Sequence, residues 1–249
     1  PSGSRGWQLP HGVQGAADPS FACVIRAFAA QFPHPRLGGG ALSVYLDGGP
    51  VVDVWTGWGD RRGRHHWQAD TAPMVFSATK GVASTVIHRL ADRGLIDYDT
   101  PVADYWPEFG ANGKAGITVR DVMRHRAGLS HLGGVRKREL LDHRHMEERI
   151  AAAPVGRHFG KSTYHALTYG WLLSGLARAV TGKGMRELIR TEVAAPLDTD
   201  GIHLGRPGPD APTQFARFVG SQMNIPNPVF NAVAPAVAAL ELSAAFGAM

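Results

Sequence analysis

The apolar positions in the first part of the chain change from helical spacing to strand alternation. Between residues 21 and 32 large apolar side chains recur every three or four positions, and Asp18 followed by Pro19 is typical of a helix start. We expect this helix to end before Pro33. Residues 1–15 are glycine-rich and polar, and we expect them to follow the surface.

A β-hairpin is predicted after this helix. Leu42, Val44 and Leu46 alternate with more polar positions, residues 47–50 form a turn that contains two glycines, and residues 51–56 resume strand character.

Helical spacing returns from Ser77 to about residue 197, most clearly over residues 77–92 and 169–180. Because the strands come first and the helices afterwards, the order predicts an α+β protein rather than alternating βαβ units.

The predicted organisation is one domain over residues 1–249. Within it, residues 1–66 hold the N-terminal helix and the hairpin, and residues 77–204 hold a helical region that begins with the helix after Ser77. Residues 205–249 form a tail rich in proline and alanine, whose fold the pattern does not predict.

Composition narrows the possible functions. An apolar content of 44% is ordinary for a folded protein. The net charge of +5 is dispersed among acidic residues, so we expect a solvated surface and no nucleic-acid partner. Cys23 is the only cysteine, which excludes an internal disulfide. We find no signal peptide and no membrane span, and we predict a cytoplasmic protein whose start at Pro1 is processed or artificial.

The tetrapeptide Ser77-Ala78-Thr79-Lys80 carries the strongest chemical signal. Residues i and i+3 of a helix share one face, so the amine of Lys80 can reach the hydroxyl of Ser77. Serine needs such a neighbouring base or cation to become a nucleophile, and S-x-x-K is a signature of serine acyl-transferring enzymes.

Further segments follow this motif in a fixed order. They are Gly94 to Val102, the H-x-x-G-L turn at the end of Ile117 to Leu129, the tyrosine segment Tyr164 to Gly170, Val180 to Lys183, and Ala195-Pro196-Leu197. With this series the chain resembles the serine β-lactamase-like hydrolases, in the branch of class C β-lactamases and family VIII carboxylesterases. The resemblance implies a β-lactamase/transpeptidase-like fold, an antiparallel sheet with flanking helices plus an all-helical region.

The resemblance also implies a catalytic site made of Ser77, Lys80 and Tyr164. At a helix N-terminus the backbone N–H groups favour developing negative charge, and the N–H of Ser77 can donate to the oxyanion of a tetrahedral intermediate. Lys80 and Tyr164 form a coupled proton-transfer pair, so neither is named as the sole base.

Other patterns predict no further chemistry. Residues 160–163 resemble the end of a P-loop but lack its opening glycine at the required spacing. His143 and His145 lie in the charged run of residues 143–148 without metal-site spacing, and we expect a solvated helix face. We expect His125 to brace a turn rather than to titrate in catalysis.

Two departures from the family matter. Its tyrosine motif in β-lactamases reads Y-x-N, whereas Ala166 fills the third position here and has no amide to hold a substrate. A K-T-G, H-x-G or W-x-G motif on a late strand is not found. We therefore expect an incomplete sheet, an incomplete form of a longer hydrolase, weak activity of this chain alone and self-association through the unpaired hairpin edge.

The sequence predicts a serine carboxylesterase that cleaves short-chain esters, which are small molecules, through an acyl-enzyme and without metal or organic cofactor. A D-alanyl peptidase or weak β-lactamase using the same residues is one alternative. An inactive β-lactamase-like protein with a binding or structural role is another.

Overall fold

The computed structural model describes residues 7–33, 38–60, 62–205 and 213–217, which cluster into two compact units. Residues 7–74 with 213–217 belong to the first unit and residues 75–205 to the second. The strands and α-helices are β1 (Val13–Ala17), α1 (Ala22–Ala30), β2 (Gly39–Leu46), β3 (Gly49–Gly57), α2 (Thr79–Asp92), α3 (Val102–Tyr105), α4 (Val119–Met123), α5 (His143–Ala152), α6 (Thr168–Thr181) and α7 (Met185–Leu188). Shorter 3-10 turns cover Pro19–Phe21, Phe76–Ala78, Pro107–Gly110, Lys137–Leu141 and Ala195–Leu197, and Ile189–Ala194 forms a π-helix.

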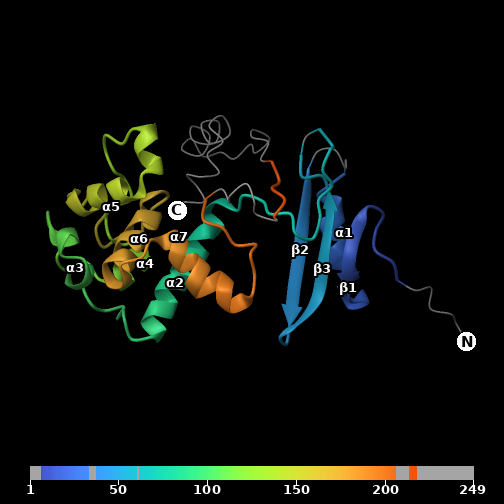
Figure 1. Cartoon of the computed structure of the whole chain (residues 1–249), viewed down its shortest axis with the longest axis horizontal. Helices are drawn as coiled ribbons and strands as arrows, with labels where there is room; N and C mark the ends of the chain where they lie inside the picture. The colour runs from blue at the N-terminus through green and yellow to red at the C-terminus, as the bar shows by residue number, and fades with distance from the viewer. Residues whose placement is uncertain (1–6, 34–37, 61, 206–212, 218–249) are drawn as a thin grey trace, which may run out of the picture. The chain divides into compact units, whose positions relative to one another are not determined.

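The first unit is a three-stranded antiparallel sheet in the order β1-β3-β2, with helix α1 (Figure 1). Asp47 and Gly48 have positive φ angles of 51° and 80° and make the tight turn between β2 and β3, which confirms the predicted hairpin. The predicted first helix is also confirmed, because Asp18 accepts a hydrogen bond from Ser20 N and caps the turn that leads into α1. Ile25 of α1 is fully buried against the sheet.

Strand β1 is missing from the sequence analysis, which expected residues 1–15 to follow the surface and predicted no strand there. Val13 pairs with Thr56 of β3 and is buried, so the segment forms an edge strand. Gly15 in the middle of β1 interrupts the strand pattern in the sequence. This position requires a glycine because a Cβ would lie 2.1 Å from Asp53 O.

A short late segment also joins the first unit. Ala72 forms a parallel bridge with Phe215, and Arg217 N donates to Gly59 O at 2.7 Å. Residues 206–212 and 218–249, which make up the rest of the predicted tail, lie outside the described residues.

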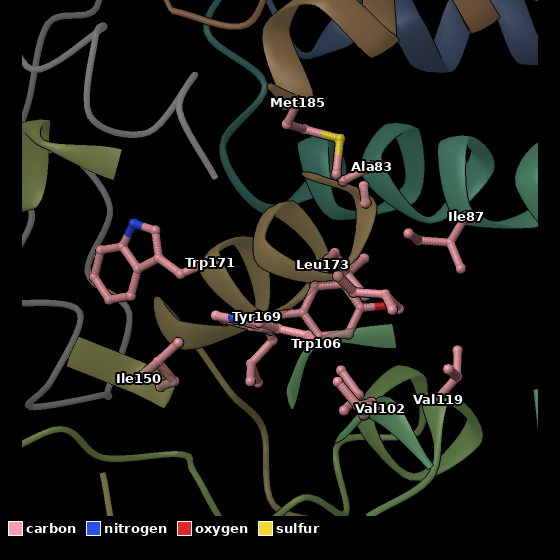
Figure 2. Packing of buried hydrophobic residues seen from close by; sticks show 14 of the residues in the cluster. Ala83, Ile87, Val102, Trp106, Val119, Ile150, Tyr169, Trp171, Leu173 and Met185 are labelled. Carbon is pink, nitrogen blue, oxygen red and sulfur yellow. The ribbon is translucent and has the colours of Figure 1, made fainter. Parts of the chain in front are cut away.

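The second unit is helical, and its core forms around α6, where ten consecutive residues from Thr168 to Ala177 are buried. Figure 2 shows side chains of α2, α6 and α7 in the same cluster, among them Ala83, Ile87, Leu173 and Met185. Strands followed by helices confirm the predicted α+β class.

The burial of Glu147 on α5 contradicts the expectation that residues 143–148 form a solvated helix face. Its side chain is only 3% exposed, and its carboxylate accepts hydrogen bonds from Ser174 Oγ at 2.5 Å and from Arg178 Nε at 2.7 Å. Because α5 packs against α6, the carboxylate meets a guanidinium and a hydroxyl instead of water.

Lys114 is fully buried and donates to the carbonyl oxygens of Ala111 and Ala153, which joins the loop after Pro107–Gly110 to the end of α5. Burial lowers the pKa of its ammonium.

Among the described residues, no helix has both the length and the apolar content to cross a membrane. Within the same residues, no group of three or more His, Cys, Asp or Glu side chains is placed to hold a metal ion.

Candidate active site

Ser77 lies in the 3-10 turn Phe76–Ala78 that leads directly into α2, and it is exposed. Phe76 before it has a φ of 47°, a left-handed conformation that costs a non-glycine residue about 1–2 kcal/mol. Because Ser77 lies in the first turn, its N–H has no acceptor within the helix and is available to a bound group.

Lys80 is buried and lies one turn after Ser77. Its Nζ donates to Ser77 Oγ at 3.1 Å and to the carbonyl oxygen of Ala166 at 2.7 Å. The second bond fixes the Lys80 ammonium between α2 and the segment that carries Tyr164.

Tyr164 belongs to a segment of turns and irregular structure, residues 156–165, that is hydrogen-bonded to residues 125–128. Gly156 N donates to Gly128 O at 3.0 Å. Gly128 has a φ of 71°, and a Cβ there would lie 2.9 Å from the backbone of Phe159, which explains the glycine of the H-x-x-G-L turn.

The Tyr164 ring lies beneath Lys80, with Nζ 5.1 Å from the ring centroid, and Tyr164 is 55% exposed. The three predicted site residues are therefore brought together. Among the described residues, the Tyr164 hydroxyl makes no hydrogen bond to Ser77 or Lys80, and the ammonium instead faces the π-electrons of the ring.

His125 contacts both neighbours of Tyr164. Its carbonyl oxygen accepts the Thr163 N–H at 2.9 Å, and its Nδ1 accepts the His165 N–H at 3.2 Å. Its ring centroid lies 5.1 Å from that of Tyr164 and 4.5 Å from that of Tyr169. Burial, followed by repulsion from His165 and Lys80, lowers the pKa of His125.

His165 is fully buried and has one tautomer. Its Nε2 accepts the Leu129 N–H at 3.1 Å, so Nδ1 carries the hydrogen and donates to Thr163 O at 2.6 Å. Burial lowers the pKa of His165. The imidazole therefore joins the H-x-x-G-L turn to the tyrosine segment as a neutral group.

Tyr169 connects the same region to α2. Ser84 Oγ donates its only hydrogen to Lys80 O at 2.8 Å, so the Tyr169 hydroxyl donates to Ser84 Oγ, also at 2.8 Å. Sequence reasoning missed Ser84, His165 and Tyr169. The one available signal was the i+4 spacing of Ser84 from Lys80.

Ala166 presents its carbonyl to Lys80 and only a methyl group as its side chain. Residues 160–163 belong to the segment that carries Tyr164 and do not begin a helix, and Gly160 N donates to Arg126 O at 3.0 Å. They do not have the geometry of a phosphate-binding loop.

The sequence matches the protein family described as Beta-lactamase over residues 25–246. Esterase/beta-lactamase LipL of Mycobacterium tuberculosis strain H37Rv is 71% identical over 210 residues, which cover 84% of this chain and 49% of LipL. The chain thus spans about half the length of this curated relative.

Two solved structures support the same family assignment. A family VIII carboxylesterase is 35% identical, with a TM-score of 0.76, and the match covers 83% of this chain and 57% of that structure. A penicillin-binding protein homolog from Caulobacter crescentus is 34% identical, with a TM-score of 0.72 and coverage of 78% and 53%. The fold that the sequence resemblance predicted is confirmed.

Proposed function

Because the chain belongs to the β-lactamase family of serine hydrolases, we propose that it cleaves short-chain carboxylic esters through an acyl-enzyme on Ser77. The observation that carries this proposal is the 3.1 Å contact between Lys80 Nζ and Ser77 Oγ. A buried ammonium or amine at this distance supplies the proton-transfer partner that a serine hydroxyl needs.

In the proposed first half-reaction, Ser77 Oγ bonds to the ester carbonyl carbon while its proton passes to the Lys80–Tyr164 pair. The Ser77 N–H donates to the oxyanion. Collapse of the tetrahedral intermediate breaks the bond to the alkoxide, which takes a proton from the pair and leaves as the alcohol.

Water then attacks the acyl-Ser77 ester and gives one proton to the same pair. The carboxylic acid leaves as Ser77 recovers its proton, so the site returns to its starting state. Tyr164 is half-exposed, and its hydroxyl must turn toward Ser77 or be bridged by substrate during these steps. Catalytic hydrogen bonds often tighten only when substrate is bound.

Ester preference rests on Ala166. An amide substrate loses a hydrogen-bond partner when this position lacks a side-chain donor, whereas an ester does not need one. The family VIII carboxylesterase likeness supports the same choice.

A β-lactamase or D-alanyl peptidase activity is the second candidate. It is favoured by the name of LipL, which joins esterase and β-lactamase, and by the likeness to a penicillin-binding protein homolog. Both reactions would use the same acyl-enzyme.

Hydrolysis of p-nitrophenyl butyrate tests the proposal. Wild-type protein, Ser77→Ala and the exposed control Ser162→Ala should be assayed side by side. We expect Ser77→Ala to lose nearly all turnover and Ser162→Ala to keep it, because removal of a nucleophile removes the chemical step. No turnover by the wild type would instead support the inactive, binding or structural alternative.

A further inference from the structure

His125 holds both residues that flank Tyr164, but it has no part in the proton path described above. Its carbonyl accepts the Thr163 N–H and its imidazole Nδ1 accepts the His165 N–H. The residue before Tyr164 and the residue after it are therefore both hydrogen-bonded to His125. The backbone bond would exist with any residue at this position, whereas the second requires a side-chain acceptor.

The backbone of His125 has a φ of 58°, a conformation that is unfavourable for most side chains. Such strain persists where the surrounding structure fixes it, and it is concentrated at functional sites. Here the left-handed backbone follows directly after α4 and the residue Arg124 that ends it. It lets one residue present its carbonyl to Thr163 and its ring to His165.

The ring of His125 packs between two tyrosines. The ring centroid of His125 lies 5.1 Å from that of Tyr164 and 4.5 Å from that of Tyr169. The Tyr169 hydroxyl bonds to Ser84, which in turn bonds to the carbonyl of Lys80. A continuous set of contacts thus joins the ring to the α2 turn that carries Lys80.

The protonation state of His125 fits this arrangement. Lys80, His165, Tyr164 and Tyr169 face the ring, and burial together with the first two disfavours the imidazolium. Because Nδ1 accepts a hydrogen bond, the neutral ring carries its hydrogen on Nε2.

We propose that His125 is a positioning residue whose neutral imidazole holds the backbone after Tyr164 and so keeps the phenol beside Lys80. The inference rests on the proposed function for its kinetic consequence, but the hydrogen bond itself can be tested without activity.

His125→Gly and His125→Asn form the decisive pair of variants. Glycine suits the positive φ and removes only the side chain. Asparagine also tolerates this conformation and places Oδ1 near the position of Nδ1. His88→Asn, on the exposed face of α2, is the matched control for the same exchange outside the site.

Amide hydrogen exchange tests the bond directly. In His125→Gly the His165 amide should exchange about fivefold faster or more, the change expected from the loss of one typical hydrogen bond. The Thr163 amide, which bonds to the backbone of residue 125, should stay protected, and His125→Asn should restore protection of His165. Unchanged exchange at His165, or equal loss at both amides, would overturn the role of the imidazole.

Kinetics with p-nitrophenyl butyrate test the consequence. We expect His125→Gly to lower kcat by about 10²-fold with little change in KM, as a small misplacement of a reacting group can do. Added imidazole or His125→Asn should recover part of this loss, and His88→Asn should match wild type. A wild type that is inactive overturns the proposed function, whereas an active wild type with an equally active His125→Gly overturns the positioning role.

Discussion

Lys80 Nζ, in the first turn of α2, lies 3.1 Å from Ser77 Oγ in the 3-10 turn that leads into this helix. The contact is local, since both residues belong to one stretch of four. The partner that completes it, the carbonyl of Ala166, lies 86 positions later in the chain. A local motif and a distant segment thus meet at one nitrogen atom.

Lys80 and Tyr164 should act as a unit. Lys80→Ala and Tyr164→Phe should each lower kcat for p-nitrophenyl butyrate by about 10²–10⁴-fold, the usual contribution of acid–base groups. Because the two share one proton path, the double variant should be little worse than either single variant. Lys183→Ala, at an exposed ion pair with Glu187, should match wild type. Losses that multiply in the double variant would contradict a shared path.

Ala166 should determine the preference for esters. The wild type should hydrolyse p-nitrophenyl butyrate and open a cephalosporin far more slowly. Ala166→Asn supplies an amide donor and should shift the ratio of kcat/KM values toward the cephalosporin by about tenfold, the effect of one good hydrogen bond. Ala152→Asn, an exposed position on α5, controls for the exchange itself. A wild type that opens both substrates equally well would refute this role of Ala166.

Glu147 should matter for stability in a way that its neighbour Glu148 does not. Glu147→Ala leaves Arg178 unpaired and should lower the free energy of unfolding by about 3 kcal/mol, the lower end for a broken buried pair because Arg178 keeps 27% exposure. Glu148 pairs with Arg144 at 65% exposure, so Glu148→Ala should cost less than about 1 kcal/mol. Urea denaturation measures the free energy of unfolding of both variants. Equal losses would contradict the larger contribution that we assign to the buried pair.

Stability should fall in mild acid because buried histidines must become charged. Burial lowers the pKa of His165 from 6.5, so the unfolded chain binds this proton at a higher pH than the folded protein does. The free energy of unfolding therefore decreases as pH falls below about 6.5, by at most about 1.36 kcal/mol per pH unit for each such group.

The pKa values of His125 and His143 are lowered as well, so both residues add to the decrease of the free energy of unfolding with falling pH. His165→Gln, which cannot titrate, should be less stable than wild type at pH 7 but should lose less stability between pH 7 and pH 5. Urea denaturation at both pH values measures the slopes, and identical slopes would exclude His165 as a contributor.

Sequence patterns predict the parts of this protein that depend on neighbouring residues. The hairpin follows from strand alternation around Asp47 and Gly48, and the Ser77–Lys80 contact follows from helix geometry. The family resemblance adds Tyr164, which no local spacing connects to Lys80.

The remaining features depend on tertiary packing. The bond from His165 N to His125 Nδ1 spans 40 positions, and the ion pair of Arg178 with Glu147 spans 31. The sequence does not show which helix packs against a charged residue. Glu147 was therefore wrongly predicted to be solvated. Strand β1 was missed because Gly15 interrupts a strand of only five residues.

Covalent labelling with a fluorophosphonate tests the central claim, that Ser77 is the nucleophile, most directly. The intact mass of the protein should rise by one phosphonyl group, and peptide mapping should place the adduct on Ser77, with no labelling of Ser77→Ala and normal labelling of Ser162→Ala. An adduct on Ser130 or Ser162, or undiminished labelling of Ser77→Ala, would contradict the account.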